Sequence, residues 1–314
     1  MEIQFLGTGA GMPSKLRNTS SLVLNLSAEG RGYWLFDCGE ATQHQILHTS
    51  LKPRKIEKIF ITHLHGDHIF GLPGLISSRS FLGGDEPLHI YGPPGLEQWL
   101  LTTLKLTNTH LNYSLAIHEV KAGNVLYEDD QFSVSCALLE HVVPSYGFKI
   151  EQKPLPGKLL IDKVNALGVP KGPMLKMLKE GQDVTLEDGR VIYSEEVTGE
   201  NQPGFTVTIL GDTKYSEASI GLAMNADVLV HEATFDQVTG TIADEYGHST
   251  IQDAAKIAKN AHVQALIANH ISARFLPSDI EQFKNEGCEV FETLYIAEDF
   301  RRFVWKDGAI SPLD

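Results

Sequence analysis

The stretch Thr62-His63-Leu64-His65-Gly66-Asp67-His68 decides how the rest of the chain is interpreted. It follows residues 56–61, a short apolar and β-branched run that predicts a buried strand. His63 and His65 are two residues apart, so both side chains point to the same side of an extended segment. A buried strand therefore delivers two imidazoles together at its end.

The second half of this motif turns away from the strand. Gly66 frees the backbone to turn, so that Asp67 and His68 can face a second position. Imidazole and carboxylate groups suit zinc, with manganese or iron as competitors. A solvated histidine-rich loop is the alternative, and partner ligands elsewhere in the chain are needed to decide between the two.

Composition limits the class of protein. The chain has 314 residues, of which 42% are hydrophobic and 21% charged, as in an ordinary globular protein of one large or two smaller domains. No run of 18 apolar residues occurs, so no membrane span is expected, and residues 1–7 indicate a strand rather than a secretion signal. Cys38, Cys136 and Cys288 are too widely spaced for a disulfide framework, which favours a reducing cytoplasm.

Charge is unevenly distributed along the chain. The formal net charge of −14 argues weakly against nucleic-acid binding, because phosphate contacts require cations. Residues 149–179, however, contain seven Lys and only two acidic residues. Proline and glycine interrupt this part of the chain, and short helices are predicted at 159–164 and 174–179. The pattern of 151–200 predicts a Lys-rich arm that projects from the domain; a solvated excursion without a partner is the alternative.

Six predicted strands end in His, Asp or Glu, which indicates a site at one edge of a layered sheet. Seven of these side chains are candidate metal ligands: His63, His65, Asp67, His68, His141, Asp212 and His270. The first metal would be bound by His63, His65, His141 and Asp212, and the second by Asp67, His68, Asp212 and His270. Two metals bridged by Asp212 would activate water to hydrolyse an ester, amide or phosphodiester.

Two further segments are polar and lie beside predicted turns or helix ends. Residues 13–18 place two cations and an amide after a glycine-rich turn, so they either hold a phosphate or base or form a solvated loop. His248 precedes a predicted helix at 251–262, for which Ser249 or Thr250 is the expected N-cap. His248 is therefore expected beside the positive end of a helix.

Taken together, these motifs resemble a known family along the whole chain. The H-x-H-x-D-H loop, the later single His, the G-D-T aspartate and the final His resemble the metallo-β-lactamase fold. The more specific signals are P-x-K-x-R-N at 13–18, H-E-A-T at 231–234, H-S-T at 248–250 and H-I-S-A-R at 270–274. This combination is similar to the ribonuclease Z family.

The resemblance implies an α/β (α+β) fold, a four-layer αββα sandwich formed as a single domain by residues 1–314, with a tRNA-binding arm at 151–200. It implies two Zn²⁺ per chain. The implied activity is that of an endoribonuclease that cuts precursor tRNA 3′ of the discriminator nucleotide, leaving a 3′-OH on the tRNA and a 5′-phosphate on the trailer. It also implies a homodimer, in which the arm of one subunit presents tRNA to the active site of the other.

The resemblance also assigns roles to side chains. Asp67 would be a ligand and accept a proton. His248 would protonate the leaving 3′-oxygen or stabilise its charge, and Glu232 would orient His248. Three cationic residues would contact RNA: Lys15, Arg17 and Arg274. For Arg274, a structural ion pair is the alternative.

Two other functional classes remain open at this stage. A binuclear hydrolase of small esters, such as a lactonase, aryl sulfatase or cyclic-nucleotide phosphodiesterase, would use the same ligands but would give the Lys-rich arm no purpose. A catalytically silent RNA-binding member would lack a ligand, and no ligand is missing. The sequence leaves open which metal is bound and whether trailers that begin with CCA are spared.

Overall fold

The structure, a computed structural model, describes residues 1–313 and divides the chain into two compact units. The first unit consists of Met1–Tyr127, Val134–Ile150 and the chain from Thr206 onward. The second consists of Glu128–Ser133 and Glu151–Phe205. The prediction of a single domain carrying an arm at 151–200 stays a prediction.

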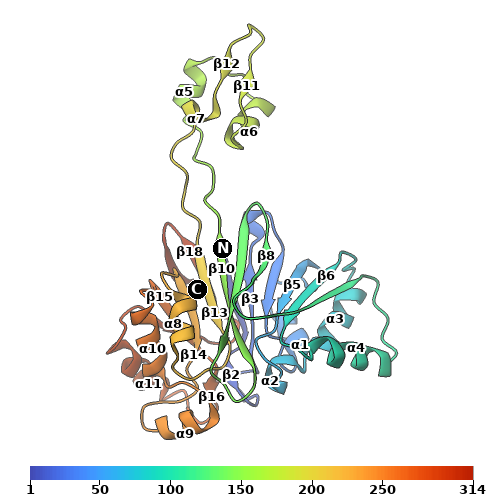
Figure 1. Ribbon diagram of the computed structural model, residues 1–314, viewed down its shortest axis with the longest axis vertical. Helices are drawn as coiled ribbons and strands as arrows, with labels where there is room; N and C mark the ends of the chain where they lie inside the picture. The colour runs from blue at the N-terminus through green and yellow to red at the C-terminus, as the bar shows by residue number, and fades with distance from the viewer. Residues whose placement is uncertain (314) are drawn as a thin grey trace. The chain divides into compact units, whose positions relative to one another are not determined.

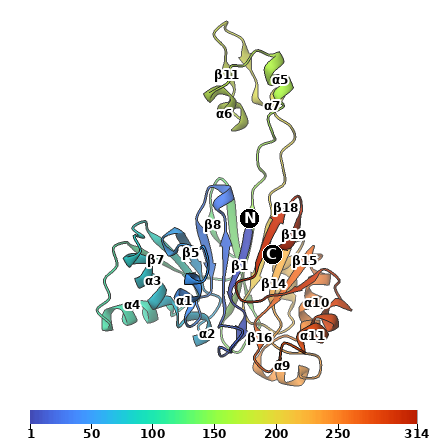
Figure 2. The same ribbon diagram turned by 180° about the vertical axis from the view of Figure 1, so that it is seen from behind.

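The first unit is built on two sheets (Figures 1 and 2). The eight-stranded sheet has the order β19 (Ala309–Leu313), β18 (Arg302–Lys306), β1 (Glu2–Gly7), β3 (Ser21–Asn25), β4 (Tyr33–Phe36), β5 (Ile56–Phe60), β6 (Leu88–Gly92) and β7 (Leu115–Glu119). The seven-stranded sheet has the order β17 (Leu294–Ile296), β15 (Ala265–Asn269), β14 (Val228–Glu232), β13 (Thr206–Leu210), β10 (Ser145–Gln152), β9 (Phe132–Leu139) and β8 (Val125–Glu128). A short parallel pair joins β2 (Gly9–Ala10) to β16 (Ile271–Ser272).

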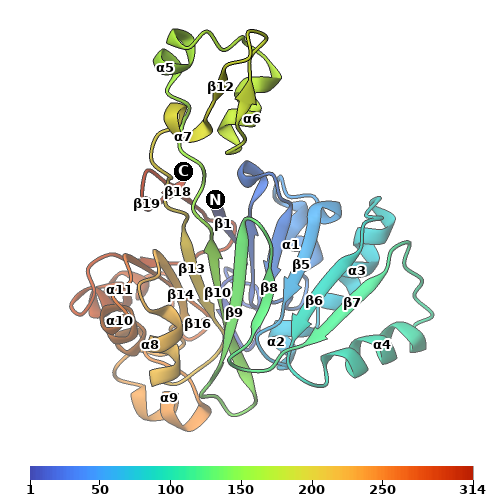
Figure 3. The ribbon, with the colours of Figure 1, turned by 45° about the horizontal axis from the view of Figure 1, so that its top comes forward.

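Helices cover the outer faces of both sheets, as Figure 3 shows. On the eight-stranded sheet these are α1 (Thr42–Leu47), α2 (Gly66–Ile69), α3 (Leu72–Phe81) and α4 (Leu96–Leu106). On the seven-stranded sheet they are α8 (Glu217–Ala223), α10 (Ile251–Asn260) and α11 (Ile280–Cys288), whereas α9 (Gly240–Tyr246) lies beyond the end of that sheet (Figures 1 and 3). Two single 3₁₀ turns lie at Ser27–Glu29 and Pro53–Lys55. The predicted αββα sandwich is confirmed.

Aromatic packing holds the two sheets together. The ring of Phe60 stacks on Phe36 with centroids 4.9 Å apart, and the ring of Phe148 from the opposite sheet lies 5.3 Å from Phe60. All three side chains are buried. Large buried aromatic rings provide much of the apolar area that stabilises such a core.

Helix α10 begins and packs as its sequence predicts. Residues 251, 254, 255, 257 and 258 of α10 are buried and apolar, which is the spacing of one helix face. Thr250 is the N-cap and forms a capping box with Asp253, so the choice between Ser249 and Thr250 is decided. The chain's last strands separate, since β17 joins the seven-stranded sheet and β18 the eight-stranded sheet.

Gly66 does not play the backbone role expected of it. It begins α2 without a positive φ, so the backbone does not require glycine there. A Cβ at Gly66 would lie 2.2 Å from a carbon of the Phe70 ring. Phe70 is exposed, so a larger residue at position 66 requires its ring to move aside.

The second unit has a small core of its own. Its elements are α5 (Ile161–Ala166), α6 (Pro173–Lys179), β11 (Val184–Thr185), β12 (Val191–Ile192) and α7 (Ser194–Val197). The predicted helices at 159–164 and 174–179 correspond to α5 and α6, but the hairpin and α7 were not foreseen. Seven buried apolar side chains meet in this core: Val164, Val169, Leu178, Val184, Leu186, Ile192 and Val197.

The second unit is not Lys-rich as a whole. Residues 151–205 contain seven Lys or Arg and nine Asp or Glu, a net charge of −2. The prediction considered residues 149–179, where the lysines lie, and missed the acidic residues of 180–205. No helix of the described residues has the length and hydropathy needed to cross a membrane.

Replacing Leu178 by Ala should unfold the second unit locally. Leu178 is fully buried in its core, and such a truncation typically costs about 2–5 kcal/mol. Amide exchange should accelerate over 161–197 and remain unchanged in α10. The exposed Leu160, replaced by Ala, is the control. Equal protection of 161–197 in both variants would contradict this prediction.

Candidate metal centre

The seven candidate ligands lie at the ends of strands or just after them. His63 and His65 follow β5, Asp67 and His68 lie in α2, and the other three follow β9, β13 and β15. These last three are His141, Asp212 and His270. All seven come together, and the structure contains three groups with ligand atoms within 4.8 Å of one another.

Four of the imidazoles are held through Nδ1. His141 donates from Nδ1 to the carbonyl of Gly247 at 2.7 Å, and His68 donates to Asp37 Oδ2 at 2.7 Å. His270 and His63 donate to the hydroxyls of Thr234 and Thr62, since each hydroxyl itself donates to a carboxylate. Protonation at Nδ1 leaves the Nε2 lone pair of each ring free.

These free lone pairs point at one another. His68 Nε2 lies 3.2 Å from His270 Nε2, and His63 Nε2 lies 3.1 Å from His65 Nδ1. His141 Nε2 is 3.3 Å from the same His65 nitrogen. The two unprotonated Nε2 atoms of His68 and His270 repel at this distance unless a cation lies between them, whereas the two contacts of His65 Nδ1 depend on its tautomer. The donor set therefore fits a metal site, and metal dependence follows from this chemistry.

Asp212 connects the groups. Its Oδ2 lies 3.6 Å from His63 Nε2 on one side and 3.5 Å from both His68 Nε2 and His270 Nε2 on the other. Asp67 Oδ2 is 3.3 Å from His270 Nε2 and also accepts from the amide of Gly11 at 2.8 Å. A single carboxylate thus faces both sets of imidazoles.

Electrostatics favour positive charge here. Burial alone would raise the pKa of Asp212, but His270 and His68 hold the pKa of this carboxyl well below its usual value. Burial likewise lowers the pKa of His68, yet Asp212, Asp37 and Asp67 together raise the pKa of its imidazole well above the ordinary value. The position therefore attracts a cation, whether a proton or a metal.

Asp37 is a functional residue that the sequence reasoning missed. It follows β4 with φ of 55° and is buried. Besides His68 Nδ1, its carboxylate accepts from the amide of Thr62 at 2.8 Å and from the Thr62 hydroxyl at 2.9 Å. Asp37 thereby fixes both the orientation and the tautomer of His68. Its position at a strand end was the available signal.

His248 and Glu232 form the predicted pair. His248 Nδ1 lies 2.9 Å from Glu232 Oε1, and Glu232 is buried at the end of β14. Burial would lower the pKa of His248, but Glu232 raises it to about 9. His248 Nδ1 is also 3.8 Å from Asp212 Oδ2, which makes His248 part of the third ligand group, with Asp212 and His270.

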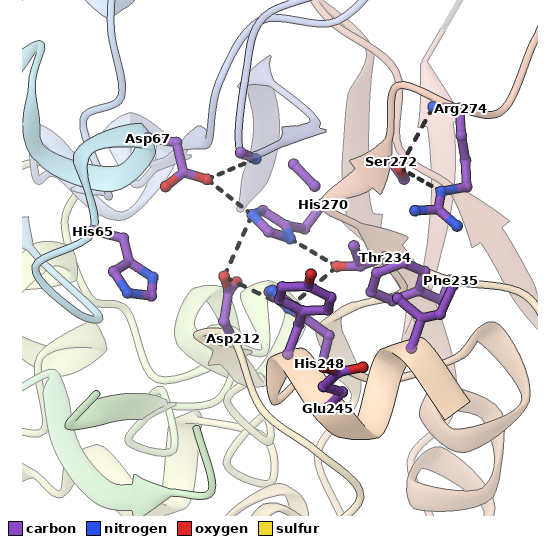
Figure 4. Close-up of a pocket in the computed structure, with 14 residues that line it drawn as sticks. His65, Asp67, Asp212, Thr234, Phe235, Glu245, His248, His270, Ser272 and Arg274 are labelled. Carbon is purple, nitrogen blue, oxygen red and sulfur yellow. Dashed lines mark hydrogen bonds and ion pairs between the residues drawn. The ribbon is translucent and has the colours of Figure 1, made fainter. Parts of the chain in front are cut away.

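Thr234 joins this pair to the ligands. Its hydroxyl donates to Glu232 Oε2 at 2.6 Å. The same hydroxyl accepts from His270 Nδ1 at 2.9 Å (Figure 4). One hydroxyl therefore orients a candidate ligand and the carboxylate that holds His248.

A pocket of about 630 Å³ opens above these residues. Arg274 lies at its rim, with its guanidinium 4.7 Å from the Phe235 ring and Nε 3.2 Å from the Ser272 hydroxyl (Figure 4). α9 contributes Ile242, Glu245 and Tyr246 to the lining. Lys15 is exposed, whereas the Arg17 guanidinium is half-buried and bonded within the protein.

Comparison with known proteins identifies the family. The chain is 52% identical over 299 residues to "Ribonuclease Z" of Latilactobacillus sakei subsp. sakei (strain 23K), covering 95% of this chain and 96% of that protein. It is also 52% identical over 303 residues to "Ribonuclease Z" of Anoxybacillus flavithermus (strain DSM 21510 / WK1), covering 96% and 97%. The chain belongs to the ribonuclease Z family. It is thereby a nuclease-class enzyme.

Solved structures agree with this ribonuclease Z assignment. The crystal structure of human tRNase Z, short form, matches with a TM-score of 0.71 and 33% identity over 97% of this chain and 99% of that one. The metallo-β-lactamase fold protein YhfI from Bacillus subtilis matches with a TM-score of 0.66 at 18% identity, which concerns the fold alone. A family model described as "Anti-Pycsar protein Apyc1" matches residues 1–156.

Replacing Thr234 by Val should loosen metal at the Asp67–His68–His270 group. The change keeps side-chain size but leaves His270 Nδ1 without its acceptor, and lost partners of this kind typically cost about 10–100-fold in metal affinity. Chelator competition measures the affinity, and Thr234→Ser should restore it. Thr208→Val is a matched control, because that buried hydroxyl has no partner. Equal metal retention in the two Val variants would refute the role of Thr234.

Proposed function

We propose that this chain is a tRNA 3′-processing endoribonuclease. It cuts precursor tRNA on the 3′ side of the discriminator nucleotide, leaving a 3′-OH on the tRNA and a 5′-phosphate on the trailer. The observation that carries the proposal is a complete His/Asp cluster beside the His248–Glu232 pair, in a chain about half identical to ribonuclease Z along nearly its whole length. The likeness to human tRNase Z supports tRNA as the substrate.

We infer two zinc ions per chain. His63, His65, His141 and Asp212 would hold one, and Asp67, His68, Asp212 and His270 the other. The position of Asp212 Oδ2 between both sets of imidazoles supports a bridging role. When bound, zinc ions at these positions supply Lewis acidity, which lowers the pKa of water and offsets negative charge on a phosphate.

The chain's own residues handle the protons. Asp67 Oδ2 accepts from the Gly11 amide and would also take the proton released by the attacking water. His248 donates from Nδ1 to Glu232, which leaves Nε2 to protonate the leaving 3′-oxygen. Glu232 raises the pKa of His248, which favours the protonated form that this role requires.

Binding of RNA would use cations outside the cluster. Arg274 at the pocket rim and Lys15 on the 13–18 loop would contact phosphates, and the lysines of 149–179 would contact the body of the tRNA. A homodimer, in which each arm serves the other subunit, is part of this proposal. The clustering of lysine at 149–179 in an otherwise acidic chain supports RNA contact by that segment.

The decisive experiment maps the ends produced from a precursor tRNA. Protein purified without chelator should release tRNA ending in the discriminator nucleotide with a 3′-OH, together with a 5′-phosphorylated trailer. Sequencing of both fragments identifies the bond cut. Turnover of lactones or cyclic nucleotides without any cleavage of the RNA would instead indicate a small-ester hydrolase.

His248→Ala should lower turnover about 10²–10⁴-fold without loss of metal, because a positioned acid typically contributes that much. Metal analysis should still give two equivalents, whereas Asp212→Ala should lose both. If the His248 variant loses metal instead, His248 is a ligand within the group that it forms with Asp212 and His270.

Replacing Lys171 and Lys179 by Ala should weaken tRNA binding and leave hydrolysis of bis(p-nitrophenyl) phosphate unchanged. Both side chains are exposed on the second unit, and no candidate ligand lies there. If both contact phosphates, the slope of log affinity against log salt should decrease by about two. Lys121 and Lys259, exposed on the first unit, are the control pair. An unchanged slope would indicate that these lysines extend into solvent without contacting tRNA phosphates.

A further inference from the structure

The loop at residues 13–18 is closed at its base. Ser14 donates its amide to the carbonyl of Arg17 at 2.8 Å, and Gly9 donates to the carbonyl of Asn18 at 2.8 Å. Lys15 and Leu16 are left at the exposed tip. The loop therefore presents a cation on a short, internally bonded turn.

Arg17 is half-buried at the wall of the groove that Lys15 also lines, and its guanidinium is bonded within the protein. Its Nη1 donates to the Thr8 hydroxyl at 2.7 Å and to the carbonyl of Ala297 at 2.6 Å. Burial lowers the pKa of this guanidinium, while Asp299 and Glu298 oppose that effect. To reach a phosphate, Arg17 would have to give up both bonds, so its place is inside the loop base.

Asp299 gathers the surrounding segments. Its Oδ1 accepts from the Thr8 hydroxyl at 2.7 Å, and its Oδ2 accepts from the Asn18 amide at 2.7 Å and from Gln45 Nε2 at 3.1 Å. Gln45 in turn donates to the carbonyl of Leu6 at 2.7 Å. We call Thr8, Arg17 and Asp299 the loop clamp. Together they tie the residues just before the loop and the last residues of the loop to the segment between β17 and β18.

The clamped loop lies between the pocket over the candidate ligands and a neighbouring groove. Ala10 and Gly11, just before the loop, line the pocket over the metal ligands. Lys15 and Leu16 line a neighbouring groove of about 680 Å³, whose other wall includes Phe275. The clamp itself makes none of the contacts to the candidate ligands; the link to Asp67 is made by Gly11.

We propose that the loop clamp positions Lys15 for RNA phosphate at the boundary between pocket and groove, and takes no part in hydrolysis. This rests on the proposed function, because it assigns specificity for the long RNA substrate to a network that a small phosphodiester does not use. The clamp holds the loop backbone and leaves the Lys15 side chain exposed, so less backbone freedom is lost on binding than with a free loop. Asp299 and Arg17 are thus positioning residues.

Asp299→Asn is the first test. The change keeps the shape of the side chain but replaces one carboxylate oxygen by an amide N–H₂ group. This group faces hydrogen-bond donors and cannot accept from them. KM for precursor tRNA should rise roughly tenfold, the order expected for a lost charge-assisted hydrogen bond, with kcat nearly unchanged. Metal content and hydrolysis of bis(p-nitrophenyl) phosphate should match wild type. Asp307→Asn, at an exposed position with φ of 53°, is the control.

Thr8→Val provides a second, isosteric break of the same network and carries the test if the Asn variant does not fold. A double-mutant cycle with Lys15→Ala then tests whether the clamp acts through Lys15, because residues that act through one another give non-additive effects. In the Lys15→Ala background, the clamp variant should raise KM no further.

Three outcomes would overturn the inference: unchanged KM in the clamp variants, additive effects with Lys15→Ala, or an equal loss of small-phosphodiester hydrolysis. Failure of the wild-type protein to cut precursor tRNA counts separately, against the proposed function.

Discussion

The site depends on lone pairs that are made to face one another. In four imidazoles an acceptor at Nδ1 holds the proton on that nitrogen, so each Nε2 is left as a bare donor toward the common centre. The acceptors are a backbone carbonyl, a carboxylate and two hydroxyls that are themselves bound to carboxylates. A buried network thus maintains an arrangement that is unfavourable without a cation.

The fold supplies the positions for this network. Asp37 and His63 come from the eight-stranded sheet, whereas Asp212, Glu232 and His270 come from the other. The site is therefore assembled only when the two sheets pack, and the contacts among Phe36, Phe60 and Phe148 are part of what holds it together. The ligand geometry therefore depends on core packing between the sheets, which brings together ligands that are far apart in sequence.

Many features of the fold and the site could be predicted from the sequence because they follow from local patterns. The strand before His63, the ligand spacing and the helix start at Thr250 each depend on neighbouring residues. Residues defined by long-range contacts were missed or misjudged. Asp37 acts through His68, 31 positions away, and the last strands separate into different sheets. Arg17 resembles a phosphate contact until Ala297 and Asp299 are found beside it. The charge of the second unit was misjudged because only part of it was counted.

The bond from the Gly11 amide to Asp67 has a thermodynamic consequence. Asp67 is a candidate ligand, and Gly11 lies two residues before the loop at 13–18, so the loop and the cluster share one hydrogen bond. A substrate that moved the Gly11 amide away from Asp67 would raise the basicity of that carboxylate, and by linkage a change at Asp67 would alter the free energy of moving Gly11 by the same amount. The hydrogen bond joins the cluster to Gly11 alone, so changes at the loop tip or in the loop clamp need not reach the ligands.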